Sequence, residues 1–161
     1  MNVAEFTKNL NEWDLKEINS GFKENVTCIN VQGPALFYRF VGFKGDGKPN
    51  EIYGKWWFSE QTFNDFQTRA DRLEVKFSQY AKARLALPDA WNSKLDIYQL
   101  SLPSGVNIPA LKGKGRGQKE SYQHKDKHLF YPNVILIGGD DQYYFKVADI
   151  QKFPVSQMVK F

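Results

Sequence analysis

Apolar side chains recur at helical spacing in two parts of the chain, which predicts two helical segments. The first covers residues 3–19 and ends at Ser20-Gly21. Its apolar positions near one face are Val3, Phe6, Leu10, Trp13 and Ile18. The second covers residues 62–87, with Thr62 as a candidate cap and Pro88 as its stop. Its apolar positions are Phe63, Phe66, Ala70, Leu73 and Phe77.

Segments rich in aromatic and β-branched residues predict strands elsewhere in the chain. In segment 35–43, Tyr38 and Phe40 face one side, while Arg39 and Val41 face the other. The other predicted strand regions are 52–59, 94–105, 106–119 (a short strand that runs into a basic loop) and 131–161 (a strand, a Gly-Gly turn, a strand and a terminal strand). Because the helices come early and the strands late, with no internal repeat, we expect one α+β domain over residues 1–161.

Composition narrows the class of protein. Hydrophobic residues make up 42% and aromatic residues 16% of the 161 residues, so we expect a core rich in aromatic rings. No apolar run is long enough to span a membrane. The N-terminal stretch carries charges throughout and lacks the apolar segment of a signal peptide, which favours a cytoplasmic location.

Cysteine and histidine content argues against disulfide and metal chemistry. Cys28 is the single cysteine of the sequence, which excludes an internal disulfide and a cysteine zinc site. His124 and His128 stand at i and i+4, but Lys125 and Lys127 beside them would repel a cation. We therefore expect no metal site.

The net charge of +4 and the isoelectric point of about 9.0 favour contact with anions: nucleic acid, phosphates or an acidic protein. The positive excess is concentrated in residues 112–128. We interpret this segment as a solvated flexible loop, because alternating Gly and Lys make it too supple to read bases rigidly. A docking surface for an anionic partner is the alternative.

Three polar residues stand inside aromatic strand segments: Arg39 in FYRF, Ser59 in WWFSE and Gln142 in GGDDQYYF. An arginine fork binds a phosphate or pyrophosphate through two bonds. A serine hydroxyl at a strand end can fix a ribose or an amide, and a glutamine can bond ribose hydroxyls without adding charge. Together these residue types describe a site for a dinucleotide. The sequence has no P-loop, GxSxG or strand-linked GxGxxG motif.

Each position also has a structural interpretation. An arginine at position 39 can pair with a carboxylate at the edge of the core, and Gln142 can stabilise a hairpin turn after Gly-Gly-Asp-Asp. The aromatic run 56–58 is typical of a packed core as well as of a wall that stacks on a flat ring.

Strand alternation limits which of these aromatic residues can line a pocket. It places Trp57 and Ser59 on one face and Trp56 and Phe58 on the other. We expect only one of the two sets to face the ligand and the rest to be core.

The order of these motifs resembles the ADP-ribosyltransferase superfamily, which includes small bacterial toxin domains and NAD glycohydrolases. That family has an arginine on the first core strand, a hydrophobic-serine segment on the next and a polar or acidic residue on a later strand. Here those roles fall on Arg39, Ser59 and Gln142. The resemblance implies a split antiparallel β-sheet core over residues 35–161, after an N-terminal helical lead-in over residues 1–34.

One departure from the family shifts the expected reaction. Arginine-class transferases usually carry Glu-x-Glu at the late position, whereas this chain has Asp140-Asp141-Gln142. Glycohydrolases of the tuberculosis necrotizing toxin class have glutamine there and use water as the acceptor. The resemblance therefore implies NAD as substrate and hydrolysis of its nicotinamide–ribose bond. A transferase with a macromolecular acceptor, or an inactive binder, remains the alternative.

The resemblance also implies roles for individual residues. Arg39 would anchor the pyrophosphate, and Gln142 would bind the ribose diol as it flattens toward an oxocarbenium ion. Ser59 would brace the nicotinamide riboside, and Trp57 or Phe58 would pack on a ring. The implied NAD-binding set is Arg39, Tyr38, Trp57, Phe58, Ser59 and Gln142.

A toxin requires protection in the cell that makes it, so the resemblance implies an immunity protein. The basic segment 112–128 would suit an acidic one. A delivered toxin would act in the cytoplasm of its target cell. The interpretation from a different class is a non-catalytic basic module that contacts nucleic acid or protein through the same segment.

Overall fold

The computed structural model describes residues 1–42, 52–87, 96–124 and 127–158. In these ranges the chain is mixed α and β, with five helices and a seven-stranded sheet in which every pairing is antiparallel. The helices are α1 (Val3–Thr7), α2 (Glu12–Gly21), α3 (Glu60–Arg72), α4 (Phe77–Leu85) and α5 (Val147–Ile150). The strands are β1 (Thr27–Gln32), β2 (Ala35–Val41), β3 (Trp56–Ser59), β4 (Asp96–Leu102), β5 (Asn107–Lys114), β6 (Gln118–His124), β7 (Lys127–Leu136), β8 (Asp141–Tyr144) and β9 (Val155–Gln157). This architecture is compatible with the predicted α+β class.

The seven-stranded sheet divides into two halves at β3. Its strand order is β1-β5-β8-β3-β2-β4-β9. The first two residues of β3, Trp56 and Trp57, pair with β8, and its last two, Phe58 and Ser59, lie opposite β2. A four-residue strand therefore joins β1, β5 and β8 on one side to β2, β4 and β9 on the other.

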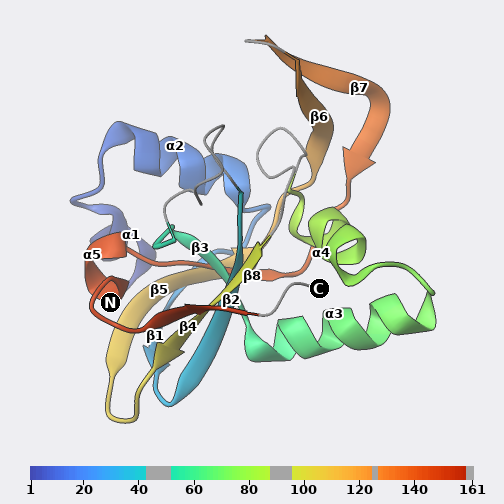
Figure 1. Ribbon diagram of the computed structural model, residues 1–161. Coiled ribbons are helices and arrows are strands. Elements are labelled where there is room, and N and C mark those ends of the chain that lie inside the picture. Colours follow the sequence, from blue (N-terminus) through green and yellow to red (C-terminus); the bar gives the residue numbers. More distant parts are fainter. Residues whose placement is uncertain (43–51, 88–95, 125–126, 159–161) are drawn as a thin grey trace.

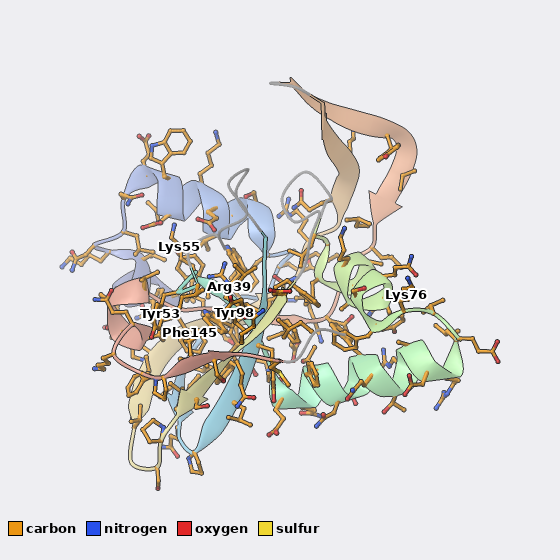
Figure 2. All side chains as sticks on the ribbon, viewed as in Figure 1. Arg39, Tyr53, Lys55, Lys76, Tyr98 and Phe145 are labelled. Carbon is orange, nitrogen blue, oxygen red and sulfur yellow. The ribbon has the colours of Figure 1, made fainter. Side chains whose placement is uncertain are left out.

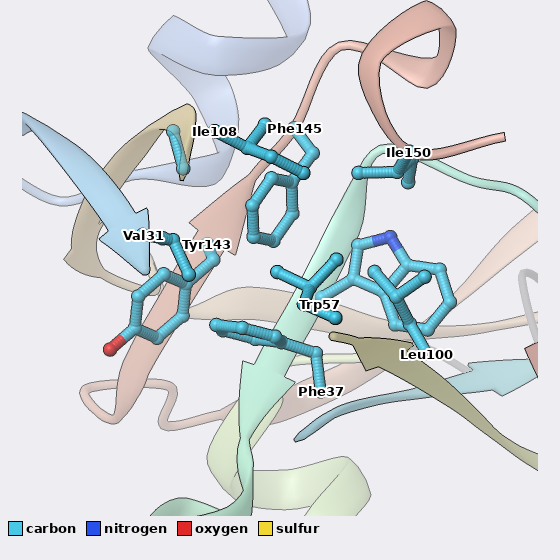
Figure 3. Close-up of a cluster of buried hydrophobic side chains, with 10 residues drawn as sticks. Val31, Phe37, Trp57, Leu100, Ile108, Tyr143, Phe145 and Ile150 are labelled. Atoms are coloured by element: carbon cyan, nitrogen blue, oxygen red, sulfur yellow. The ribbon is translucent and has the colours of Figure 1, made fainter. Parts of the chain in front are cut away.

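Three apolar clusters fill the spaces around these halves. The central cluster takes residues from both halves and from α5, and the Phe37 ring packs edge to face on Tyr143 and Phe145 (Figure 3). Its buried members are Val31, Phe37, Trp57, Leu100, Leu102, Ile108, Ala110, Tyr143, Phe145 and Ile150. A second cluster packs α3 and α4 against β2, β3 and β4, and a third packs α1 and α2 against β5 and β8. Helices therefore cover the outer face of each half (Figure 1).

Both predicted helical segments are interrupted. The segment predicted over residues 3–19 forms α1 and α2, because Asn11 accepts a hydrogen bond from Asp14 N at 2.8 Å and starts a new helix. The segment predicted over residues 62–87 forms α3 and α4. Between them Glu74 has a φ of +54°, a left-handed conformation that ends a helix.

The strand predicted over residues 35–43 is confirmed for residues 35–41, which form β2, and the region 52–59 contributes only β3. The flexible loop predicted over residues 112–128 is wrong for most of its length. Its beginning is the end of β5, and β6 pairs with β7 in a hairpin that projects from the body of the molecule (Figure 1). The sequence patterns did not predict β1, which pairs with β5 along its whole length, or the short helix α5.

Candidate functional site

A cavity of about 400 Å³ opens where the two halves of the sheet separate. The end of α2 forms one wall, the end of α4 forms another, and β2, β3 and β8 contribute the residues between them. The lining residues are Glu17, Ser20, Gly21, Arg39, Phe40, Trp56, Trp57, Phe58, Leu85, Ala86, Leu87, Arg116, Gln118 and Gln142. Of the predicted site residues, Arg39, Trp57, Phe58 and Gln142 meet at this cavity.

Arg39 belongs to β2 and lines the cavity (labelled in Figure 2). Its guanidinium carbon lies 5.6 Å from the centre of the Trp57 ring, and its Nη1 donates to the carbonyl of Ile52 at 3.4 Å. Gly54 passes so close that an added Cβ would lie 1.5 Å from Arg39 Nη1. The half-buried guanidinium is thus held between an aromatic ring and a backbone segment that has no side chain.

Gln142 reaches the cavity from β8. Its Nε2 donates to the carbonyl of Leu85 at 2.9 Å, and only 9% of the residue is exposed. Gly115 leaves room for it, since a Cβ there would lie 2.3 Å from Nε2. The preceding Asp140 accepts a hydrogen bond from Arg84 of α4, which ties the start of β8 to the same helix. Gln142 is therefore fixed by α4 and does not serve only the turn before it.

The aromatic residue that offers most surface to the cavity is Trp56. Trp57 and Phe58 are 1% and 3% exposed and belong to two of the packed clusters. Trp56 is half-buried, and its Nε1 donates to Glu17 Oε1 at 2.5 Å. Gly21 lets α2 approach the ring, because a Cβ there would lie 2.4 Å from Trp56 Cη2. The expectation that only one face of β3 borders the cavity does not hold, since the lining draws on both.

Two other predicted site residues lie elsewhere. The Ser59 hydroxyl caps α3, accepting from Thr62 N at 3.3 Å, and Ser59 is not among the lining residues. Tyr38 packs in the cluster under α3, with its ring stacked 4.4 Å from that of Phe63. Burial raises the pKa of Tyr38, and the charge of Glu60 adds to this effect.

The cavity also contains residues that the sequence patterns did not select. Glu17, Ser20 and Gly21 come from α2, inside the segment predicted as a helical lead-in. Arg116 follows β5, and its guanidinium donates to the carbonyls of Phe22 and Lys23 at 3.0 and 3.2 Å. The only available signals were the polar residues on α2 and an arginine within a basic run, and neither indicates a cavity.

A charged cluster fixes α2 beside this cavity. Lys55 Nζ lies 2.5 Å from Asp14 Oδ1 and 2.9 Å from Glu17 Oε2 (Lys55 and Arg39 are labelled in Figure 2). Partial burial opposes the charged form of Lys55, but the hydrogen bonds to these two carboxylates outweigh it and raise the pKa of Lys55. Lys55 is therefore a stable cation at neutral pH.

In the described part of the chain, no group of three or more His, Cys, Asp or Glu side chains is gathered to hold a metal ion. The pair considered above, His124 and His128, lies outside the described side chains. No helix in the described ranges is long and apolar enough to cross a membrane. Compared with known proteins, the sequence matches no protein-family model and has no significant match among curated proteins.

Proposed function

We propose that this protein consumes NAD, cleaving the bond between nicotinamide and ribose with water or a macromolecule as the acceptor. The observation that carries the proposal is that Arg39, Trp56 and Gln142, from three neighbouring strands, line one cavity. A guanidinium, an indole ring and a carboxamide match the pyrophosphate, a planar ring and the ribose hydroxyls of a dinucleotide.

The cavity residues support a separate role for each residue in that reaction. Arg39 binds the pyrophosphate, and Arg116 supplies a second guanidinium in the same lining. Gln142 uses Nε2 on the Leu85 carbonyl, so its Oε1 accepts from a ribose hydroxyl. Trp56 packs on a ring in place of the more buried Trp57 and Phe58.

When water is the acceptor, the reaction balances with NAD and water as the only reactants. The glycosidic C–N bond breaks, its electron pair goes to the nicotinamide nitrogen, and the ring leaves as neutral nicotinamide. Positive charge passes to the ribose, and a water oxygen forms the new bond to its anomeric carbon. The proton of that water goes to solvent, and ADP-ribose is the other product. Groups that interact more strongly with this cationic ribose than with bound NAD accelerate the step.

The sheet topology supports an ADP-ribosyltransferase type of fold as part of the proposal. The strands that carry Arg39, Ser59 and Gln142 are neighbours in the order β2, β3 and β8. The exchange of partners within β3 splits the sheet where the cavity opens. This arrangement brings Arg39 and Gln142, which are far apart in sequence, to one cavity, whereas Ser59 on the strand between them caps α3.

The test is nicotinamide release from NAD by the purified chain and by the Arg39→Ala and Gln142→Ala variants. We expect turnover by the wild type and a loss of about 100-fold or more in each variant, as for groups that hold a transition state. Arg72→Ala, on α3, and Gln99→Ala, on β4, are matched controls outside the lining and should retain turnover. Absence of release by the wild type contradicts the proposal.

A second measurement identifies the acceptor. NAD labelled in the adenylate part is incubated with the protein alone and with cell lysate. Label recovered only as ADP-ribose indicates water as the acceptor, and label attached to protein or nucleic acid indicates a transferase. Gln142 favours water, because the position at which arginine-class transferases carry a carboxylate to activate an acceptor group holds a neutral carboxamide here.

The projecting β6–β7 hairpin favours a second candidate function, a docking or nucleic-acid-binding module. Residues 112–128 contain six Lys or Arg against two acidic residues. Exposed apolar side chains also lie on β7 and just after it, at Val134, Ile135 and Ile137. However, Lys112 and Lys114 both pair with Asp141, at 3.2 and 2.6 Å, which reduces the charge offered to a partner.

An acidic immunity protein would be one such partner of the hairpin. Copurification of a complex that Lys119→Glu weakens would support this proposal, whereas healthy expression of the active chain alone would contradict it. For nucleic acid, binding that falls steeply between about 50 and 200 mM salt, with no NAD turnover, would favour the module over the enzyme.

A further inference from the structure

We infer that Glu17 of α2 is the anionic group of the proposed site and contacts the substrate ribose as nicotinamide leaves. The inference rests on the proposed function and extends it to a residue outside the predicted catalytic core. It assigns α2 a part in the chemistry as well as in packing.

The reaction creates a need that the predicted residues do not meet. When neutral nicotinamide departs, the positive charge of the pyridinium ring moves to the ribose, and an anion near that ribose lowers the barrier. Arg39 and Arg116 are cations, and Gln142 is neutral. Among the lining residues in the part of the chain that the structure describes, Glu17 is the single acidic one.

The geometry holds this carboxylate in a defined position. Trp56 Nε1 donates to Oε1 at 2.5 Å, and Lys55 Nζ donates to Oε2 at 2.9 Å. The close approach of Gly21 to the Trp56 ring fixes α2, and hence Glu17, relative to β3. Each oxygen still has further acceptor capacity, since a carboxylate can accept about four hydrogen bonds. Glu17 can therefore keep both partners and also accept from a ribose hydroxyl.

The charge of Glu17 is not cancelled by Lys55. Asp14 and Glu17 share the single ammonium of Lys55, so the three groups together carry one negative charge. Asp14 does not line the cavity, which leaves Glu17 as the member that faces the substrate. The cluster thus supplies an anion at a fixed place on the wall that α2 forms.

The pairing of Asp14 and Glu17 on one lysine provides a matched experiment. Glu17→Gln keeps the shape and the hydrogen-bond acceptor for Trp56 but removes the charge at the cavity. Asp14→Asn removes a charge from the same lysine without touching the cavity. Nicotinamide release then gives kcat and KM for both variants and the wild type, and thermal unfolding gives their stability.

We expect Glu17→Gln to lower kcat about 10- to 100-fold while KM changes less than about threefold, as for an interaction made mainly in the transition state. This loss of kcat should be smaller than for a fully buried carboxylate, because 39% of the Glu17 side chain is exposed to solvent, which screens its charge. Asp14→Asn should lower the melting temperature to a similar extent and keep kcat within about threefold of the wild type. The affinity for ADP-ribose, which lacks the positive charge, should be the same in both variants.

Three results would overturn the inference. Equal kcat values for the two variants would mean that Glu17 contributes only to the packing of α2. A rise in KM alone would make Glu17 a ground-state binding group. A wild type without turnover would contradict the proposed function itself. An active wild type with an equally active Glu17→Gln variant would contradict only the role of Glu17. If Glu17→Gln does not fold, Glu17→Asp keeps the charge but withdraws it by one methylene, and it should still lower kcat more than Asp14→Asn.

Discussion

The guanidinium of Arg39 occupies space that is free only because residue 54 is a glycine. An added Cβ would lie 1.5 Å from Nη1 and 2.0 Å from Cζ of Arg39, far inside any tolerated contact. The obstacle is the end of a flexible side chain, so the backbone can stay in place while the guanidinium moves. Substitution at this glycine therefore separates the position of Arg39 from the integrity of the fold.

We predict that Gly54→Ala lowers kcat/KM for NAD by about 10- to 100-fold, the worth of one hydrogen bond to a charged group. The melting temperature should change by less than about 2 °C, since the added methyl displaces the end of a flexible side chain and leaves the backbone in place. Steady-state nicotinamide release and thermal unfolding measure the two effects. Gly105→Ala is the control: its φ of +81° makes alanine strained, and it lies in a turn away from the cavity. Gly105→Ala should lose stability and keep turnover. Unchanged turnover in Gly54→Ala would place Arg39 outside the site.

Asp141 provides a prediction about pH. Burial opposes its charged form, but hydrogen bonds from Lys114 and Lys112 outweigh it and hold the pKa of Asp141 below its ordinary value of 3.8. A group whose pKa is lower in the folded state stabilises the fold above its unfolded pKa, and this contribution disappears as the pH falls through the folded pKa. The stability advantage of the wild type over Asp141→Asn should therefore be constant above about pH 5 and shrink toward pH 2–3.

Urea unfolding of both proteins at pH 7 and at pH 3 measures this advantage. The exposed Asp71 supplies the control: at pH 7, Asp71→Asn should change stability much less than Asp141→Asn, because surface charges contribute little. A difference between wild type and Asp141→Asn that is the same at both pH values would mean that Asp141 stabilises the fold by its shape and not by its charge.

At the scale of elements, the junction between β3 and α3 explains the serine at position 59. The strand ends and the helix begins at this residue, whose hydroxyl accepts from Thr62 N and lies 3.2 Å from Thr62 Oγ1. A serine before a helix satisfies a backbone donor that the first helical turn leaves without a partner. This cap holds α3 against the half of the sheet that carries Arg39.

We predict that Ser59→Ala destabilises the protein by about 1 kcal/mol, the usual cost of losing an N-cap, with a fall in melting temperature of about 2–4 °C. NAD turnover at a temperature where the variant is folded should equal that of the wild type. Ser59→Asp, which retains a capping oxygen, should recover most of the stability. Loss of turnover in Ser59→Ala without loss of stability would instead indicate that Ser59 contacts the nicotinamide riboside.

Some of these elements could be predicted from the sequence, and others could not, for physical reasons. β2 and the position of Arg39 on it follow from alternation along one strand, which is a local property. A capping serine and a ligand-binding serine look alike in a sequence, because both follow a strand and precede polar residues. Glu17 reaches the cavity where Gly21 approaches Trp56, and a contact between positions 21 and 56 depends on how α2 docks on the sheet.

At the scale of the whole molecule, the cavity is a meeting point for segments spread along most of the chain. Its lining draws on α2, β2, β3, the end of α4, Arg116 between β5 and β6, the first residue of β6, and β8. Hydrogen bonds already link some of these segments, such as Gln118 Nε2 to the Ser20 carbonyl at 3.2 Å. A ligand that contacts several of them should stabilise the native state as a unit, because the cavity does not exist in the unfolded chain.

ADP-ribose is the probe for this effect, because it carries the pyrophosphate and both riboses and is not consumed by hydrolysis. At 100 times its dissociation constant it should add about 2.7 kcal/mol to the stability, which corresponds to a rise of roughly 5–10 °C in the melting temperature. Arg39→Ala should abolish most of this rise, whereas Arg72→Ala should preserve it. A rise of equal size in wild type and Arg39→Ala would show that ADP-ribose binds away from the cavity. No rise in the wild type would mean that the lining does not recognise a dinucleotide, and the basic hairpin would become the place to search for a partner.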